Sequence, residues 1–468
     1  STYCQTYDPS DMRVLMFGWE FPPHISGGLG TACYGLTKGL AFQDVEVIFV
    51  VPKAYGDEDQ SAIKLIGASG VPVMQRTVQF YKNLTEESLP RTELTSKEIT
   101  YLEVGSMLMP YLSPEEFETF VNEKIEAKDY KWEKLLRKSQ ESKAVESKQI
   151  GTIDFSGKYG PDLLQEVSNY GLIAAEIAQG QDFDLIHAHD WLTYAAGIAA
   201  QKISGKPLII HVHATEYDRA GENVNSLVFD IERMGMEAAD RIITVSNLTR
   251  NTVVNKYGIP EEKVFTVYNA VEPNAKIEED SIRKHLNEKV VTFLGRVTFQ
   301  KGPEYFIEAA YKVLQKTDDV RFVMAGNGDL LRKMIRHAAR LGITKKFHFT
   351  DFLKGKDVDR MFQLSDVYVM PSVSEPFGIS PLEAMRSNVP VIISKQSGVS
   401  EILKYAIKID FWDVDAMADA IYGLVKYSAL SDMFSKHGKT EVDNLKWENA
   451  AKNTKEQYTA LLENIKPQ

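Results

Sequence analysis

The sequence has 468 residues, with 54 Lys and Arg against 65 Asp and Glu, which gives a formal net charge of −11. This length predicts two or three domains and a core large enough to fold without disulfide or metal staples. The acidic balance argues against nucleic acid or an anionic membrane surface as the main partner, because both favour a basic face.

Two further features narrow the class of protein. Cys4 and Cys33 are the only cysteines, so a disulfide framework and a cysteine-zinc site are not expected. No apolar run approaches the roughly 18 residues that span a bilayer, and residues 1–14 lack the apolar core of a signal peptide. We therefore expect a cytoplasmic protein with no integral membrane segment.

Short continuous apolar runs alternate with longer helical patterns along the chain, which is typical of parallel strands covered by helices on both faces. The expected strands of a first series are 13–17, 46–51, 185–187, 207–213, 241–245 and 263–267. Those of a second series are 290–294, 321–325, 346–350, 367–370 and 389–393. Two series predict two doubly wound α/β domains. The polar stretch 272–287 is the expected linker between them.

Residues 110–150 interrupt this alternation. The segment is heavily charged, has helical propensity and begins with a Ser-Pro-Glu-Glu cap. We expect a solvated helical insertion on the first domain. An arm for oligomerisation or acceptor binding is the alternative.

Ligands of open α/β sheets bind beyond the carboxyl ends of the strands, and unusual residues follow several of the expected strands. After the first strand comes Gly27-Gly28-Leu29-Gly30, followed by a helix expected to begin near Thr31. Glycines allow close approach of a ligand, and free amides at a helix start favour an anion. The spacing matches neither a dinucleotide fingerprint nor a Walker A loop. A tight strand-to-helix turn would explain the glycines equally well.

In the second domain, two cationic residues lie on the loop that follows the first expected strand. Arg296 and Lys301 follow the strand 290–294, and Pro303 suits the first turn of the next helix. A planar guanidinium and an ammonium on one loop would suit a diphosphate. Two solvated surface cations are the alternative. Gly326 follows the next strand and allows another close approach.

The segment after 367–370 is the most distinctive. Ser380, Pro381 and Glu383 form the pattern of a capping box, which by itself would explain Glu383. Glu375 precedes that helix and has no such explanation. The amides of Phe377 and Gly378 beside it could bind sugar hydroxyls.

Two His-x-His pairs, His187 with His189 and His211 with His213, lie on expected strands. Residues i and i+2 of a strand share a face, so each pair could chelate zinc. This leaves a metal-dependent hydrolase as an alternative of a different class. Histidines that are simply packed and hydrogen-bonded at strand ends are a further alternative.

Together these segments resemble the retaining GT-B glycosyltransferases of the glycogen and starch synthase group and its close relatives (family 4/5 type). Glu375 to Glu383 is similar to their E-x7-E pattern, and Gly27-Gly28-Leu29 to their glycine-rich loop. The segment 187–191 resembles H-A-H-D-W, and Arg296 with Lys301 resembles R-x4-K. Ile25 stands where bacterial starch synthases carry Lys, and 213–219 is closer to sucrose-synthase-like and mannosyl transferases.

The resemblance implies a GT-B fold. Residues 1–272 would be an acceptor-side domain, completed by a C-terminal crossing helix at 447–468, and 273–446 would bind the nucleotide sugar. The implied catalytic residues are Glu375, His213, Arg296 and Lys301. The implied donor-binding residues are Gly27, Gly28, Gly326, Phe377, Gly378, Ile379 and Glu383. Asp190 and His189 would lie on the acceptor side.

The implied roles are specific. Arg296 and Lys301 would neutralise the departing diphosphate, with no divalent metal and no cofactor. Glu383 would bind the hydroxyls of the ribose. Glu375 would contact the 3- and 4-hydroxyls of the donor sugar, and His213 would contact the 6-hydroxyl of the same sugar. Front-face attack with leaving-group assistance would retain the α configuration.

The expected function is transfer of glucose from UDP- or ADP-glucose to the non-reducing end of an α-1,4-glucan. A retaining transferase that makes another α-glycoside, such as a sucrose, trehalose or surface polysaccharide type, is the alternative within the class. A UDP-sugar epimerase of GT-B fold is a more distant one. The sequence leaves open the donor base, the acceptor, any allosteric regulation and the oligomeric state, and a homo-oligomer is compatible with it.

Overall fold

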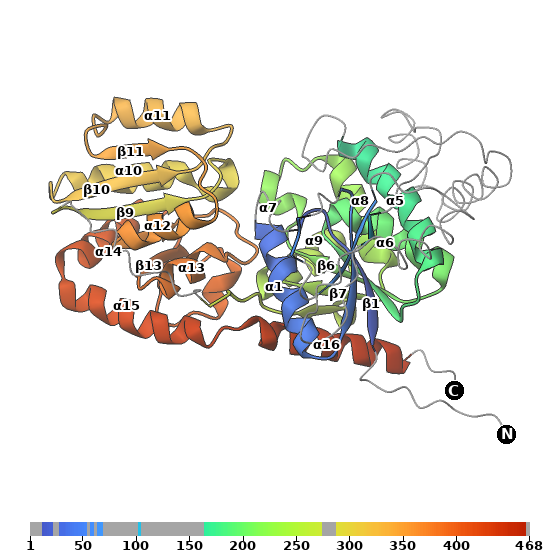
Figure 1. Ribbon diagram of the computed structural model, residues 1–468. Coiled ribbons are helices and arrows are strands. Elements are labelled where there is room, and N and C mark those ends of the chain that lie inside the picture. The colour runs from blue at the N-terminus through green and yellow to red at the C-terminus, as the bar shows by residue number, and fades with distance from the viewer. Residues whose placement is uncertain are drawn as a thin grey trace, which may run out of the picture.

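A computed structural model describes residues 12–21, 28–53, 57–59, 63–68, 102–103, 163–273 and 287–464. The expected insertion at 110–150 and Gly27 lie outside the described residues, as do most of the linker and the last four residues. Two parallel sheets, each with helices on both faces, form two Rossmann-like domains (Figure 1). The fold class predicted from the sequence is confirmed.

The first sheet has the strand order β4-β3-β2-β1-β5-β6-β7-β8 within the described residues. Its elements are β1 (Arg13–Phe17), α1 (Gly28–Phe42), β2 (Glu46–Val51), β3 (Lys64–Gly67), β4 (Leu102–Glu103), α5 (Leu163–Gly180), β5 (Leu185–His189), α6 (Trp191–Ser204), β6 (Leu208–Val212), α7 (Glu216–Ala220), α8 (Ser226–Ala238), β7 (Arg241–Thr244), α9 (Asn247–Tyr257), the 3-10 turn η2 (Glu261–Lys263) and β8 (Val264–Thr266).

The second sheet has the order β11-β10-β9-β12-β13-β14. Its elements are β9 (Lys289–Leu294), η3 (Phe299–Lys301), α10 (Pro303–Leu314), β10 (Val320–Ala325), α11 (Leu331–Arg340), β11 (Phe347–Thr350), α12 (Lys356–Leu364), β12 (Val367–Met370), α13 (Ser380–Arg386), β13 (Val391–Ser394), η4 (Gly398–Glu401), β14 (Ile407–Ile409), α14 (Val414–Lys426) and α15 (Ser428–Asp443). The chain ends in α16 (Trp447–Asn464).

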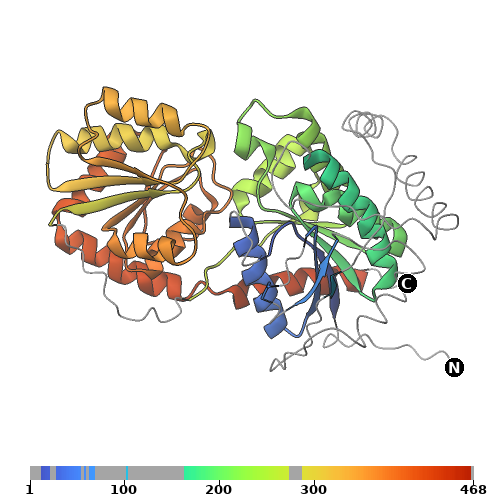
Figure 2. The same ribbon diagram turned by 45° about the horizontal axis from the view of Figure 1, so that its top comes forward.

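Alternate residues of the central strands feed two apolar layers, as parallel strands covered on both faces require. Leu15 and Phe17 of β1 pack with α5, α6 and α8 on one face. Val14 and Met16 pack with α1 and α16 on the other. In the second domain, α10, α11 and α14 cover one face, and α12, α13 and α15 the other (Figure 2).

Helix α16 lies beside α1, although more than 400 residues separate them in the sequence (Figure 1). Gly35 and Gly39 permit this approach. A Cβ at Gly35 would lie 2.2 Å from the Trp447 indole, and one at Gly39 would lie 2.6 Å from the Trp447 carbonyl oxygen. The end of the chain thus completes the core of the first domain.

The sequence-based expectations missed β3, β4 and β14, and they misplaced two boundaries that matter for the site. Helix α1 begins at Gly28 and not near Thr31, so the second glycine of the loop is already in its first turn. Strand β6 ends at Val212, which puts His213 immediately after the strand. None of the helices in the described ranges has both the length and the apolar character that a membrane span needs.

Candidate active site

Four histidines gather where β5 and β6 end. His187 and His189 share one face of β5, and the register places His189 opposite His211 on β6. His189 Nδ1 lies 2.9 Å from His213 Nε2, and His187 Nε2 lies 3.0 Å from His211 Nδ1. The Tyr458 hydroxyl on α16 lies 2.5 Å from His187 Nδ1. The cluster therefore connects the carboxyl edge of the sheet to the C-terminal helix.

Burial keeps these imidazoles neutral. Desolvation lowers the pKa of His213 to about 3. The pKa values of His187, His189 and His211 are also lowered by burial, with a further contribution from the neighbouring rings. At neutral pH, His213 is therefore a neutral hydrogen-bonding group at the mouth of a buried polar cluster.

Asp190 follows β5 in a left-handed conformation, with φ 65°, which is uncommon for a residue other than glycine. Its Oδ1 accepts from the backbone N–H groups of His213 and Ala214, both at 3.3 Å. Burial raises its pKa to about 6, while the Arg219 charge and these two N–H groups oppose the rise. The strained turn thus holds a carboxyl group against the loop that carries His213.

The short helix α7 positions the next polar groups. Thr215 and Asp218 form a capping box at its start. Arg219 pairs with Glu216 at 3.0 Å and with the buried Glu232 at 2.9 Å. These contacts fix the backbone that follows His213.

One hydrogen bond joins this helix to the second domain. The Ser374 hydroxyl donates to Asp218 Oδ1 at 2.6 Å, directly beside Glu375. Helix α7 also contacts η3, which ends at Lys301. Asp218, Arg219 and Ser374 were not among the site residues predicted from the sequence. The Thr-x-x-Asp capping signature at 215–218 could have identified Asp218, whereas its partner across the domains has no local sequence signal.

On the second domain, the polar edge that faces α7 is built around an ion pair between Lys301 and Glu375. Lys301 Nζ lies 2.6 Å from Glu375 Oε2, which also accepts from the Ser372 hydroxyl at 3.2 Å. Glu375 is 8 % exposed, and its backbone N–H donates to the Gln396 carbonyl oxygen. Lys301 is therefore an ion-paired residue and not a solvated surface cation.

Arg296 and Gly326 lie on the loops that follow β9 and β10. Arg296 is exposed, and in the described part of the chain it makes no hydrogen bond or ion pair. Gly326 has φ 150°, and a Cβ there would lie 1.8 Å from the Gly295 carbonyl oxygen. Only glycine fits at Gly326, because the two loops pass in direct backbone contact.

The capping box expected at α13 is wrong. The residue before the first helical turn is Ile379, and Ser380 makes no side-chain cap. Glu383 instead lies 3.7 Å from Arg386, and burial raises its pKa, which the Arg386 charge opposes. Glu383 is therefore not engaged in capping its own helix.

The remaining predicted donor residues surround this turn. Phe377 is buried in the apolar layer beneath α13, and Ile379 packs against the cores of both domains. Gly378 has φ 101°, a conformation that favours glycine. A small pocket is lined by Lys301, Ser372, Ser380 and Tyr368. On the opposite domain, Gly28 is exposed at the start of α1.

The structure thus brings His213, Asp190 and His189 together at one sheet edge. At the other edge it pairs Lys301 with Glu375, while Glu383 lies beside Arg386 on α13. The Asp218–Ser374 bond shows that the two edges face each other. Two domains of this type, with polar loops meeting at the carboxyl ends of their strands, form the arrangement of the GT-B fold.

Comparisons with known proteins agree with that class. The family described as "Glycosyl transferases group 1" matches residues 274–441, and "Glycosyltransferase Family 4" matches residues 141–275. An uncharacterized glycosyltransferase of Methanocaldococcus jannaschii is 31 % identical over 299 residues, which cover 60 % of this chain and 76 % of that protein. A glycogen synthase of Mycobacterium tuberculosis is 21 % identical over 457 residues, covering 96 % of this chain and 95 % of that protein.

Solved structures share the fold over nearly the whole chain. Sucrose-phosphate synthase from Thermosynechococcus elongatus has a TM-score of 0.66 at 15 % identity, covering 97 % of this chain and 100 % of that chain. The catalytic domain of starch synthase IV from Arabidopsis thaliana has a TM-score of 0.62 at 15 % identity, covering 97 % and 99 %. The chain belongs to the GT-B glycosyltransferases of the family 4/5 type.

Proposed function

We propose that the protein is a retaining glucosyltransferase that moves glucose from UDP- or ADP-glucose to the non-reducing end of an α-1,4-glucan. The observation that carries the proposal is the Asp218–Ser374 hydrogen bond, because it aligns the His213 loop with the Lys301–Glu375 pair. A donor sugar between the two edges would meet groups from both domains.

In this scheme Lys301 and Arg296 neutralise the diphosphate as it leaves. The interaction grows as negative charge develops, so it contributes most in the transition state. Glu375 orients Lys301 and accepts from hydroxyls of the donor sugar, and Glu383 accepts from the ribose. Because both cations belong to the chain, no divalent metal is required.

The first domain supplies positioning. His213, held neutral by burial, donates to or accepts from the 6-hydroxyl of the donor sugar. Gly28 brings a backbone N–H to the diphosphate, and Asp190 with His189 lines the acceptor side. In the described part of the chain Glu375 is ion-paired and Asp190 is bound by backbone N–H groups. Neither carboxylate is poised as a nucleophile, which favours front-face attack.

Two relatives support the choice of substrate. The glycogen synthase extends over 96 % of this chain. An alpha-maltose-1-phosphate synthase of Mycolicibacterium smegmatis is 28 % identical over 311 residues. A transferase making another α-glycoside is the second candidate. The sequence at 213–219 and Ile25 favour it, because both depart from the bacterial starch synthase pattern.

Lys301→Ala tests the site directly. Turnover should fall about 100-fold or more, because a cation that stabilises the leaving group is lost. Lys312→Ala is the matched control, since Lys312 is also ion-paired, with Asp415, but on the far helices α10 and α14. Near-normal turnover of Lys301→Ala would refute the assignment. Loss of wild-type activity in EDTA, with recovery on adding a divalent metal, would refute metal independence.

A further inference from the structure

The short helix η4 of the second domain contacts the start of α9 in the first domain through Glu401. One carboxylate oxygen, Oε1, accepts from the Leu248 backbone N–H at 2.8 Å, and Oε2 accepts from the Asn247 backbone N–H at 2.9 Å. The first N–H groups of a helix have no acceptor within the helix, and the helix dipole favours a negative charge beside them. A side chain of one domain therefore caps a helix of the other.

Helix α9 also has an ordinary cap, which leaves a separate task to Glu401. The Ser246 hydroxyl accepts from the Thr249 N–H at 3.1 Å, so Ser246 satisfies the third N–H of the helix. Within the described residues, the first two N–H groups have no acceptor other than Glu401. Glu401 Oε2 also accepts from the Tyr268 hydroxyl at 2.9 Å, on the chain that leads from β8 towards the linker.

The backbone of η4 contacts the loop that carries Glu375. The Gly398 N–H donates to the Glu375 carbonyl oxygen at 2.9 Å. A Cβ at Gly398 would lie 2.0 Å from the Pro376 carbonyl oxygen and 2.5 Å from Ser246 Cβ, so the glycine allows η4 to pass between this loop and the start of α9. The path from Glu375 to the first domain is therefore short and closely packed.

Apolar packing joins the two domains at the same place. Val245 and Val271, which precede the linker, share a buried cluster with Phe377 and Val399 of the second domain. Hydrophobic contacts are non-directional, whereas hydrogen bonds weaken steeply away from their preferred angles. The packing can hold the domains together, but the bonds of Glu401 restrict the angle between them.

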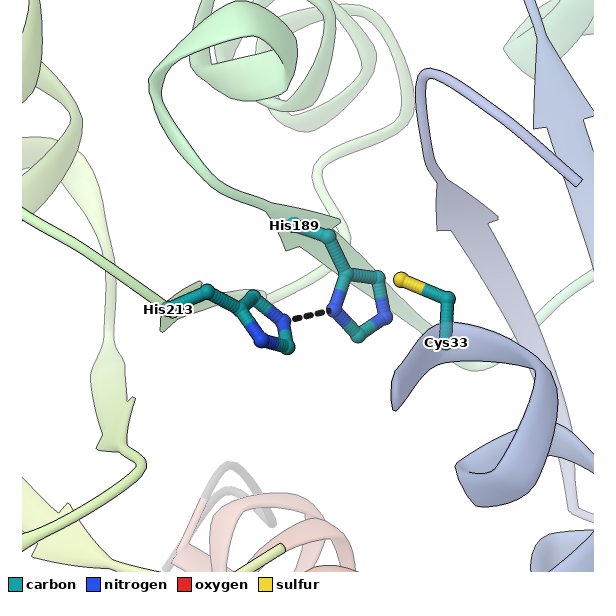
Figure 3. A group of neighbouring side chains, drawn as sticks. All are labelled: Cys33, His189 and His213. Atoms are coloured by element: carbon teal, nitrogen blue, oxygen red, sulfur yellow. Dashed lines mark hydrogen bonds between the residues drawn. The ribbon is translucent and has the colours of Figure 1, made fainter. Parts of the chain in front are cut away.

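We propose that Glu401 is a positioning residue for the transfer reaction, because its cap on α9 sets the orientation in which both domains meet one donor. The inference rests on the proposed function, in which His213 and the Lys301–Glu375 pair contact the same nucleotide sugar. The His213 ring is itself held by its hydrogen bond to His189 (Figure 3). The orientation of the domains then decides whether His213 reaches the sugar.

Two contacts between the domains flank Glu375 in this arrangement. Ser374, the residue before it, donates to Asp218, and the Glu375 carbonyl oxygen accepts from η4. The side-chain partners of Glu401 lie at the start of α9 and at Tyr268, and none of them is a predicted site residue. Glu401 therefore acts through the orientation of the domains and not through contact with substrate.

The contact can be tested without any substrate. Hydrogen–deuterium exchange at short labelling times is followed by mass spectrometry in the full-length wild type and in Glu401→Ala. The variant should lose protection at the first two amides of α9 and keep it from Arg250 onwards, where the amides bond within the helix. Glu401 lies at the surface, so water can replace the carboxylate and the helix should survive. Equal exchange in the two proteins would overturn the contact.

The positioning role is tested by calorimetric titration with UDP-glucose and ADP-glucose, which requires no turnover. Glu401→Ala should weaken donor binding about tenfold, and Glu401→Gln, which keeps one acceptor oxygen at the same reach, should lie between it and the wild type. Asp413→Ala is the matched control, because Asp413 accepts from the Ala416 N–H and caps α14 within one domain. It should lower the melting temperature and leave donor binding unchanged.

Unchanged donor binding by Glu401→Ala would overturn the positioning role. An equal loss of binding by Asp413→Ala would also overturn it, because the effect would then follow from stability alone. If the wild type neither binds nor transfers any nucleotide sugar, the proposed function fails, and the positioning role fails with it. The exchange experiment still decides in that case whether Glu401 caps α9.

Discussion

Replacing His211 by Gln should reduce the proton uptake that accompanies unfolding at pH 5 by about one proton per molecule. His211 is buried, and burial together with the neighbouring His213 and His189 lowers its pKa well below the usual value. In the unfolded chain its pKa returns to about 6.5, so at pH 5 the imidazole binds a proton only after unfolding.

The sign of the stability effect follows from the same difference. A histidine with a lowered native pKa leaves stability fully present above about pH 6.5, and that stability is lost as pH falls towards the native pKa. Each such histidine should cost about 1.4 kcal/mol per pH unit in this window, or about 2 kcal/mol between pH 6.5 and pH 5. Four buried histidines multiply this cost.

Two buried carboxyl groups release protons on unfolding and so reduce the net proton uptake. Burial raises the pKa of Asp190 to about 6 and that of Glu232 to about 7. At pH 5 each is protonated in the native protein and releases most of one proton on unfolding. Four protons taken up by the histidines and nearly two released by these acids leave a net uptake of about two from these six groups.

A pH-stat measures the uptake directly when the protein is unfolded in unbuffered urea at pH 5. His437→Gln is the matched control, because it removes an exposed imidazole from α15, outside the buried cluster. Equal uptake by His211→Gln and the wild type would refute the claim that the cluster is held neutral. A larger uptake by the variant would do the same.

The remaining predictions concern single contacts. Tyr458→Phe should lower the melting temperature, because His187 Nδ1 loses its partner at a cost of about 1–3 kcal/mol; an unchanged melt would show that the contact contributes nothing. Ser374→Ala should raise the donor KM about tenfold, since it breaks the bond that aligns the two domains, and an unchanged KM would contradict that role. Gly326→Ala should abolish activity or folding through its clash with Gly295, whereas Gly423→Ala on α14, with only ordinary contacts, should be tolerated; equal behaviour of the two would contradict the argument.

Much of the fold follows from local sequence. The continuous apolar runs that form β1, β2, β9 and β12 are long enough to distinguish buried parallel strands from loops. The strand β14 was missed because Ile407–Ile409 spans three residues and alternates with an exposed lysine. A strand so short is defined by its partner, β13, and not by its own pattern.

The site was harder to predict, because its contacts join residues that are far apart in the sequence. The residue types at 296–301 and 375–383 identify a polar edge, but the ion pair between Lys301 and Glu375 joins residues 74 positions apart. The capping box at Ser380 was a reasonable local prediction that tertiary packing overrode, because α13 begins at Ser380 itself, one residue too early for Ser380 to be the N-cap.

The stereochemistry of transfer is the most direct test of the proposed function. The protein is incubated with maltooligosaccharides and a panel of nucleotide sugars, and proton NMR follows the anomeric signal of the first product formed. Glucose from UDP- or ADP-glucose should appear in an α-1,4 linkage at the non-reducing end, and Lys301→Ala should give almost none. A β-linked product, or an acceptor that gains no glucose from either donor, would contradict the proposal.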